Sequence, residues 1–358
     1  MDRRQFLALT CSALVTPGGA AMGQTAPDSP ALDAARSYFE GRTVRVIVPA
    51  AAGSGTDRSS RIFISALAPL LPRTRFRLEN NDRAGGQIGA SELWRGRADG
   101  TVIGFPRNNL FYAQLLERDT LDFSFSDFTF FGSVTRGHRA LVLGNASEIS
   151  GVEEILAGRR IVLKSADAVT SSHFVEAMLM NALSGSRIRA VPGFSGGARN
   201  MAVISGEVDC QIGSIEAVQP IVESGAGRIV FRLSSDPLPE GLPEVPRLAD
   251  HLLDPDLDWA VGIIDAAAAI GRPFAGPPGM APEASAHWIA LFDAVVGDAA
   301  FREKAFADEG VAIDPAPADA IAARLARLSS LGDGLRDEVD ALLRCGRLLS
   351  ESTEGTCG

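Results

Sequence analysis

The chain has 358 residues, of which 46% are hydrophobic and 22% charged. This composition is that of an ordinary globular protein and excludes a disordered or membrane-embedded chain, and the length suffices for two α/β domains with substantial cores. The formal net charge of −10 argues against nucleic acid as a partner, although it does not exclude an anionic ligand, because local N–H groups decide that more than net charge does.

The first 26 residues have the pattern of a cleaved signal peptide. A basic start is followed by an apolar run that ends near residue 15 and is too short to span a bilayer. Residues 3–7, Arg-Arg-Gln-Phe-Leu, match a twin-arginine signal, which exports already folded protein. An ordinary secretory signal that contains two arginines is the alternative. Small residues predict cleavage after Gly23, with Ala26 as the other candidate, and the mature protein is expected in the periplasm.

A glycine turn between a strand and a helix is the most informative local feature. Alternating β-branched residues predict a buried strand that ends at Val48. The small residues 49–55 let the backbone turn, and Thr56 or Asp57 can cap a helix that runs on to Leu71. Such a turn directs unpaired N–H groups and the positive end of a helix dipole at one point, which suits an anion.

The rest of the chain alternates apolar runs with helical segments. Strands are expected at 76–80, 101–105, 128–134, 140–143, 160–164, 187–191 and 208–212. Helices are expected at 87–95, after 106–109 and through Leu116, at 173–183, at 198–205, and over much of 282–343. This alternation predicts open, mainly parallel sheets flanked by helices, with ligands beyond the carboxyl ends of the strands. Asp258 and Asp265 interrupt the best candidate for a membrane span, so none is expected.

The four cysteines have different expected fates. Cys11 leaves with the signal peptide, and Cys210 lies in an apolar run as a small buried hydrophobe. Cys345 and Cys357 sit in the C-terminal tail, where an exported protein can keep a disulfide. Their pairing would contribute about 3 kcal/mol in the chain-entropy model. Two independent thiols in a frayed tail are the alternative.

Short motifs follow one another in a fixed order from Val44 to Pro315. They are Pro49 through Asp57 with Arg61, Glu79-Asn80, Ala84 through Ala90, Ala98-Asp99-Gly100, Ser126-Asp127-Phe128, Ser171-Ser172-His173, Gly206 through Asp209, and Leu242 through Pro246. In this order and spacing they resemble the extracytoplasmic solute receptors of tripartite tricarboxylate transporters, the Bug-type periplasmic binding proteins.

The resemblance implies an α/β, two-lobed periplasmic-binding-protein fold of type II, with a mainly parallel sheet in each lobe and a ligand cleft between the lobes. The first lobe would comprise 42–139 plus 262–340, the second 140–261, and the tail 341–358. Family ligands are mostly small carboxylates. The resemblance therefore implies a monomeric receptor, not itself membrane-spanning, that delivers an organic carboxylate to integral-membrane transporter subunits.

The resemblance also implies which residues hold the ligand, in loops that end strands and begin helices. The expected ligand-binding residues are Ala52, Gly53, Ser54, Gly55, Thr56, Asp57, Ala84, Gly85, Gly86, Gln87, Arg107, Asn108, Ser171, Ser172, His173, Phe194, Ser195, Gly196 and Gly197. The chain departs from the family at Ala51-Ala52, where bulkier residues are usual, and at Arg107, where small polar residues are usual. Gly193-Phe194-Ser195 replaces an aromatic-then-basic pair.

Several of these residues have plainer interpretations. Asp57 could accept a hydrogen bond from the ligand or simply cap its helix, and capping is the commoner role. Arg107 could pair with a carboxylate or be solvated. Ser171 and Ser172 could donate hydroxyls to an anion, cap the following helix, or do both.

Other classes of function leave weaker signals. Ser171 or Ser195 with His173 invites a hydrolase hypothesis, but the chain has no Gly-x-Ser-x-Gly elbow, so no catalytic residue is expected. The four histidines form no close pair, which argues against a metal site. Gly53-Ser54-Gly55 lacks the third glycine of a dinucleotide fingerprint, so no cofactor is expected. The alternatives that stay open are an exported hydrolase or cofactor enzyme on a similar scaffold, and an orphan receptor that reports to a sensor.

Overall fold

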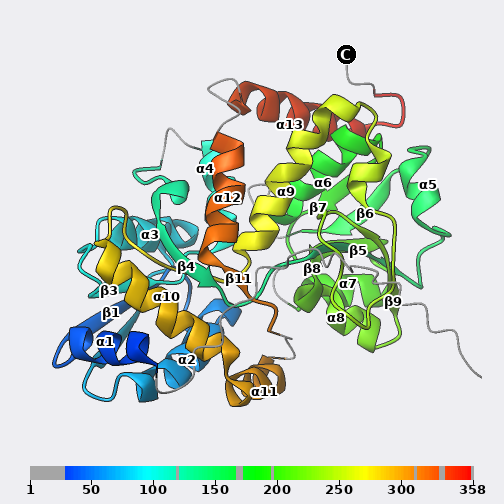
Figure 1. Cartoon of the computed structure of the whole chain (residues 1–358). Helices are drawn as coiled ribbons and strands as arrows, with labels where there is room; N and C mark the ends of the chain where they lie inside the picture. The colour runs from blue at the N-terminus through cyan, green and yellow to red at the C-terminus, as the bar shows by residue number, and fades with distance from the viewer. Residues whose placement is uncertain are drawn as a thin grey trace, which may run out of the picture.

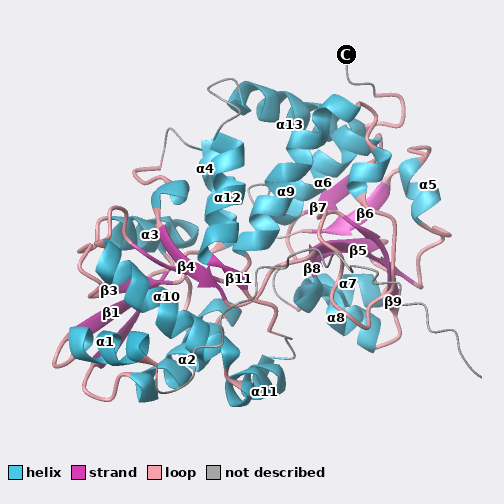
Figure 2. Ribbon diagram, in the orientation of Figure 1, coloured by secondary structure: helices cyan, strands magenta, loops and turns pink. Residues whose placement is uncertain are grey.

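The computed structural model of the chain forms two lobes, each built on one β-sheet with helices on both faces (Figures 1 and 2). The structure describes residues 29–117, 121–166, 172–194, 197–309, 313–329 and 335–355. The expected signal peptide at 1–26 lies outside these residues, as do Ser171, Ser195, Gly196 and Cys357.

The first sheet has the strand order β11-β4-β10-β3-β1-β2. Its strands are β1 (Thr43–Val48), β2 (Arg75–Asn80), β3 (Val102–Gly104), β4 (Thr129–Ser133), β10 (Pro273–Gly276) and β11 (Ala316–Pro317). β1 pairs in parallel with both β2 and β3, whereas β10 runs antiparallel to β3 and β4, and β11 antiparallel to β4. β4 therefore points in the same direction as β1.

The second sheet has the order β7-β6-β8-β5-β9. Its strands are β5 (Arg139–Gly144), β6 (Val162–Ser165), β7 (Ile188–Val191), β8 (Cys210–Ser214) and β9 (Gly227–Arg232). Within this sheet only β5 runs against the others. In the first sheet β10, which arrives from the second lobe, lies between β3 and β4. In the second sheet β5, which arrives from the first lobe, lies between β8 and β9. The prediction of two mainly parallel, helix-flanked sheets is confirmed.

The helices of eight residues or more cover both faces of each sheet. They are α1 (Pro30–Phe39), α2 (Gly55–Leu67), α3 (Gln87–Trp94), α4 (Asn108–Glu117), α6 (Ser172–Ser184), α8 (Ile215–Glu223), α9 (Asp258–Ile270), α10 (Pro282–Gly297), α11 (Ala299–Glu309), α12 (Ala318–Ser329) and α13 (Leu335–Glu351). The shorter α5 (Val152–Leu156) and α7 (Ala198–Ile204) belong to the second lobe. Within the described ranges, no helix combines the length and apolarity needed to cross a bilayer.

An aromatic cluster fixes α2 and α10 on one face of the first sheet. Phe63 of α2 lies 5.0 Å, ring centre to ring centre, from Phe274 of β10, which lies 5.1 Å from Phe105. Trp288 of α10 is fully buried and donates its indole N–H to Gly100 O at 3.1 Å. Aromatic pairs of this kind add about 0.5–1.5 kcal/mol each beyond their burial. The cluster therefore holds α2, and with it the glycine turn, firmly on β1.

A second apolar cluster runs from one lobe into the other. It includes Ile47 of the first sheet, Leu110 of α4, Ile264 of α9, and Leu141 and Ile212 of the second sheet, all of them almost completely buried. Because α4 and α9 contribute to this one cluster, the lobes are joined on this side by a packed core as well as by the connecting chain.

The first chain crossing, residues 134–138, joins the carboxyl edges of the two sheets. β4 points along β1 and so ends at the carboxyl edge of the first sheet, and β5, antiparallel to β8, begins at the carboxyl edge of the second. A connection this short spans at most roughly 20 Å when extended. The two carboxyl edges therefore adjoin the same junction.

The return crossing packs against the first. Ser133 Oγ donates to Ile270 O at 2.7 Å, and Gly137 N donates to Ala268 O at 2.7 Å. Arg272 N, just before β10, donates to Ser133 Oγ at 3.0 Å. These bonds tie the end of α9 to the first crossing, so the two connections between the lobes form one hydrogen-bonded unit.

The C-terminal segment is helical as far as Glu351 and packs along α6 (Figure 1). A methyl group at Gly346 would overlap the carbonyl of Met178, so only glycine permits this close approach. Asn181 Nδ2 donates to Gly346 O at 3.1 Å. Cys345 is disulfide-bonded. Its expected partner, Cys357, lies outside the described residues, so that pairing stays a prediction, as do the lobe boundaries.

The replacement Gly346→Ala tests this packing. Because the added methyl group meets backbone that cannot move aside, we expect a loss of about 1–3 kcal/mol in the free energy of unfolding, measured by urea denaturation. Gly297→Ala at the end of α10 is the matched control, since a methyl group there meets nothing within 4 Å. Equal stabilities of the two variants would contradict the proposed close approach.

Candidate functional site

The loop after β1 is closed by Ser54 and Asp57. Ser54 is the N-cap of α2, with an extended backbone, and its Oγ accepts from Asp57 N at 3.3 Å. The Asp57 carboxylate in turn accepts from Gly53 N at 2.8 Å. The prediction that Thr56 or Asp57 caps this helix is wrong, because both already lie within the first helical turn.

The Asp57 carboxylate is occupied by the loop itself. Only 3% of the residue is exposed, and the carboxylate also accepts from Arg61 Nε and Asn80 Nδ2, each at 3.0 Å. Burial acts to raise the pKa of Asp57, but the hydrogen bonds from Arg61 and the Gly53 N–H outweigh it and hold the pKa below its ordinary value. Asp57 therefore shapes the turn, and a direct contact with the ligand stays a prediction.

The loop after β2 lies against the first. Ala84, Gly85 and Gly86 have consecutive φ values of 51°, 65° and 95°, in the left-handed region. A Cβ at Gly86 would overlap the carbonyl of Pro49, so this glycine lets the two loops touch. In this part of the described chain, the N–H groups of Ala84 and Gly85, like those of Gly55 and Thr56 in α2, have no protein acceptor. The two loops thus gather backbone donors on one edge.

The third expected loop begins at the end of β3, on the other side of β1. Arg107 and Asn108 are both half-buried there, and Asn108 is the first residue of α4. β1, β2 and β3 are parallel neighbours, so all three loops lie at one carboxyl edge.

The expected residues of the second lobe also gather at one edge. Phe194 N donates to Ala166 O at 3.0 Å, which joins the loops after β6 and β7. Ser165 Oγ donates to Arg199 O at 3.1 Å and so fixes the start of α7, which Gly197 precedes. Ser172 and His173 begin α6 at the same edge. These contacts hold each set of loops together; a common site formed by both sets stays a prediction.

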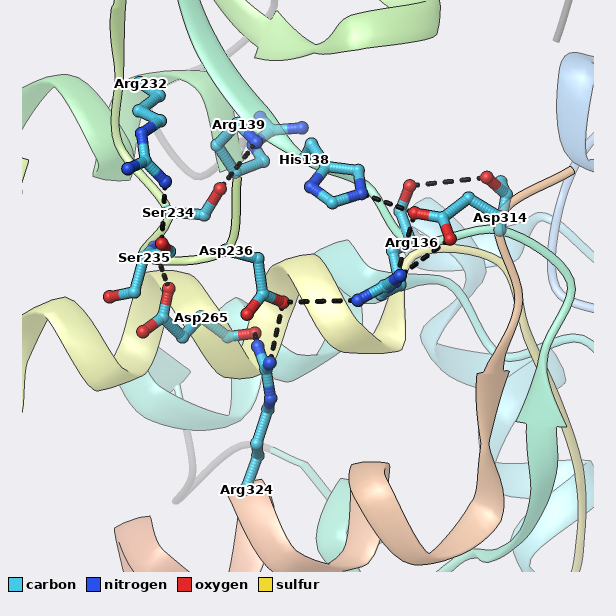
Figure 3. Close-up of polar contacts among 11 residues, drawn as sticks. Arg136, His138, Arg139, Arg232, Ser234, Ser235, Asp236, Asp265, Asp314 and Arg324 are labelled. Carbon is cyan, nitrogen blue, oxygen red and sulfur yellow. Dashed lines mark hydrogen bonds and ion pairs between the residues drawn. The ribbon is translucent and has the colours of Figure 1, made fainter. Parts of the chain in front are cut away.

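A network of charges, which sequence reasoning missed, lies where the crossings meet (Figure 3). Arg136 Nη2 lies 2.7 Å from Asp314 Oδ1, and Arg136 Nη1 lies 3.7 Å from Asp236 Oδ2. His138 Nε2 lies 2.5 Å from Asp314 Oδ2, and Arg324 of α12 lies 2.6 Å from Asp236. The sequence feature that could have indicated this network is the polar link 135–139 between two predicted strands, because the chain changes lobe there.

The junction also contains a small cavity of about 130 Å³. Its lining residues are Thr135, Arg136, His138, Ile215, Glu216, Gln219, Pro239, Glu240, Leu242, Phe306 and Asp314. A larger cavity of about 330 Å³ lies between α6 and α13, with an apolar wall from Phe174, Val175, Met178 and Leu343. None of the expected ligand-binding residues lines either cavity, within the described part of the chain.

The second lobe buries a polar cluster behind α6. Tyr112 of α4 donates to Glu176 Oε1 at 2.9 Å, and Arg139 pairs with Glu176 Oε2. Lys164 is fully buried and donates to Ser165 O at 2.8 Å. Burial lowers the pKa of Lys164 to about 7, because the ammonium has little compensating negative charge. The cluster thus connects α4 of the first lobe to the second lobe through a buried carboxylate.

The pKa of Lys164 makes stability depend on pH. Between pH 7 and about 10 the unfolded chain keeps the Lys164 proton and the folded chain loses it, so wild-type stability should rise with pH. Lys164→Met should abolish this rise and stabilise the protein at pH 7 by about 1–3 kcal/mol. The control is Lys304→Met on the exposed side of α11, which should keep the wild-type pH profile. The measurement is the free energy of unfolding in urea at several pH values. Identical pH profiles for wild type and Lys164→Met would refute the argument.

The contacts of Asp314 with His138 and Arg136 predict how stability falls at acid pH. Burial acts to raise the pKa of Asp314, but hydrogen bonds from His138 and Arg136 hold it below the ordinary value. Its contribution is therefore present above about pH 4 and lost as pH falls below that. Asp314→Asn should cost about 1–3 kcal/mol at pH 7, and the difference from wild type should shrink towards pH 3. Asp122→Asn, in an exposed pair with Arg95, should cost at most about 1 kcal/mol. A cost for Asp314→Asn that is the same at both pH values would count against the argument.

Comparison with known proteins identifies the fold. No protein-family model matches the chain, and no curated protein matches it. Among solved structures, a TctC solute binding protein from Polaromonas without ligand superposes with a TM-score of 0.68 at 20% identity, over 86% of this chain and 99% of that one. MatC from Rhodopseudomonas palustris with bound malate gives 0.57 at 20%, over 84% and 99%. A second R. palustris protein, with adipate, gives 0.59 at 18%, over 85% and 97%. The chain has the two-lobed periplasmic-binding-protein fold.

Proposed function

We propose that this chain is a periplasmic solute-binding protein of the tripartite tricarboxylate transporter type. It captures a small organic carboxylate between its lobes and delivers it to integral-membrane transporter subunits. The proposal is supported by the fold, which matches TctC-type solute-binding proteins along almost their whole length, and by the malate and adipate bound in two of the neighbours. The N-terminal signal pattern at residues 1–26 supports export to the periplasm.

The single observation that carries the proposal is the convergence of the two carboxyl edges. The loops after β1 and β2 offer the N–H groups of Gly55, Thr56, Ala84 and Gly85, and α2 directs its positive end towards the same edge. The link at 134–138 joins this edge to the carboxyl edge of the second sheet. Backbone donors at helix N-termini bind carboxylates generically, so the site requires no net positive charge on the protein.

Closure of the lobes is the proposed mechanism. Each lobe, with the boundaries given above, supplies part of the site, so the ligand favours the closed form by its differential affinity for it. The packed α4 and the buried Tyr112–Glu176 hydrogen bond join the lobes on one side. We therefore propose that opening occurs on the opposite side, between the loops.

An exported enzyme on this scaffold is the rival proposal. His173 directs Nδ1 to the carbonyl of Ile212 and not to a carboxylate, which does not favour a serine-histidine-aspartate arrangement. In the described ranges, no group of three His, Cys, Asp or Glu side chains is placed to hold a metal. A receptor that reports to a sensor would share the same site, and a co-encoded membrane partner would distinguish transport from signalling.

Ligand binding gives the direct test. Native mass spectrometry of the exported protein should detect a retained small acid, and a panel of di-, tri- and aromatic carboxylates should include one that raises the melting temperature. At one hundred times its dissociation constant such a ligand adds about 2.7 kcal/mol, which is roughly 5 °C or more. No shift with any acid of the panel would contradict the proposal.

Gly85→Val tests the loop directly. Gly85 and Gly225 both have a positive φ, 65° and 70°, and open space at the Cβ position. Both valine variants therefore carry similar backbone strain, but only Gly85 lies in the proposed site. We expect Gly85→Val to weaken ligand binding at least tenfold in calorimetry and Gly225→Val to leave it unchanged. Equal affinities for the two variants would remove this loop from the site.

A further inference from the structure

His173 occupies an unusual position at the start of α6. It is the second residue of the helix, half-buried, at the carboxyl edge of the second sheet. Its Nδ1 lies 3.1 Å from the carbonyl oxygen of Ile212 in β8. A carbonyl oxygen only accepts hydrogen bonds, so Nδ1 must carry a proton. This contact fixes the ring and turns Nε2 away from the strand.

The surroundings of His173 keep the ring neutral. Burial is the main cause, and the nearby cations Lys164, Arg199 and Arg139 add to it, so the pKa of His173 lies well below its ordinary value. The one buried carboxylate of this cluster, Glu176, is already held by Arg139 and Tyr112. A neutral imidazole with its proton on Nδ1 carries a lone pair on Nε2. That nitrogen is therefore an acceptor.

Among the described residues no donor is placed at His173 Nε2. It belongs to the same edge as Ser172, Phe194 and Gly197, three of the residues expected to meet the ligand. An acceptor at this edge repels a carboxylate oxygen, which also has only lone pairs to offer, and it needs a donor instead.

The charge around the ring selects between the two donors that a small acid can carry. An ammonium group placed at Nε2 would approach the same cations, Lys164, Arg199 and Arg139, that disfavour a proton on His173. A hydroxyl group donates the same hydrogen bond without adding positive charge. The surroundings therefore favour a hydroxyl.

We propose that His173 Nε2 accepts a hydrogen bond from a hydroxyl group of the bound acid, so that the protein selects hydroxy-substituted carboxylates over their deoxy counterparts. This inference rests on the proposed function and specifies the ligand of the same site. His173 then determines specificity, while the backbone donors of the first lobe hold a carboxylate without regard to its substituents.

Two matched pairs of acids test the inference by calorimetry: malate against succinate, and citrate against propane-1,2,3-tricarboxylate. Wild type should bind the hydroxy member of a pair about tenfold more tightly, because the deoxy acid offers His173 Nε2 no hydrogen-bond donor. His173→Asn can place its Nδ2 donor where Nδ1 lies, opposite the Ile212 carbonyl. Its acceptor, Oδ1, then takes the position of Cδ2, so no acceptor remains where Nε2 was. This variant should bring the pair within about twofold by weakening only the hydroxy acid. His287→Asn, on α10 beside Tyr38, is the control and should keep the wild-type preference.

Nitrogen NMR of His173 reports the protonation state of the ring without any ligand. We expect the neutral form with the proton on Nδ1 at pH 7; a proton on Nε2, or a charged ring, would overturn the inference. Equal binding within both pairs, a preference that survives in His173→Asn, or tighter binding of aspartate than of malate would overturn it while leaving the proposed function intact. If none of the acids binds, the result contradicts both the proposed binding of a small organic carboxylate and the inference about His173.

Discussion

The short link between β4 and β5 is the constraint on which the rest of this structure depends. It leaves the carboxyl edge of one sheet and enters the carboxyl edge of the other within residues 134–138. The carboxyl edges of both sheets therefore adjoin the same junction, and the proposed site lies between the loops at these edges. The hydrogen bonds between this link and the end of α9 add a second, parallel constraint.

Two carboxylates near the loops and the junction accept hydrogen bonds from the protein itself, whereas backbone N–H groups at the helix starts keep no acceptor within the described residues. Asp57 is held by Gly53, Arg61 and Asn80, and Asp314 is held by Arg136 and His138. These pairings make the proposed binding of an anion compatible with the net charge of −10. The carboxylates shape the loops and the junction, and the free N–H groups at the helix starts provide the local positive potential.

Local patterns predicted most of the strands, and the glycine turns, because their signals lie within a few residues. The strand up to Val48 and the turn at 84–86 are of this kind. The helix cap was misjudged because serine, threonine and aspartate all suit an N-cap, and only the backbone shows that Ser54 takes that position. The helices α1, α5, α8 and α9 and the strands β9, β10 and β11 were not predicted. The Arg136–Asp314 pair joins residues 178 positions apart, which no local pattern can show.

A crystal structure of the protein with its retained or added acid would test the central claim most directly. The account predicts the carboxylate within hydrogen-bond distance of the N–H groups at Gly55 and Gly85, with His173 of the second lobe on the other side of the same molecule. Density for the acid on an outer face, or in contact with the loops of one sheet only, would contradict it.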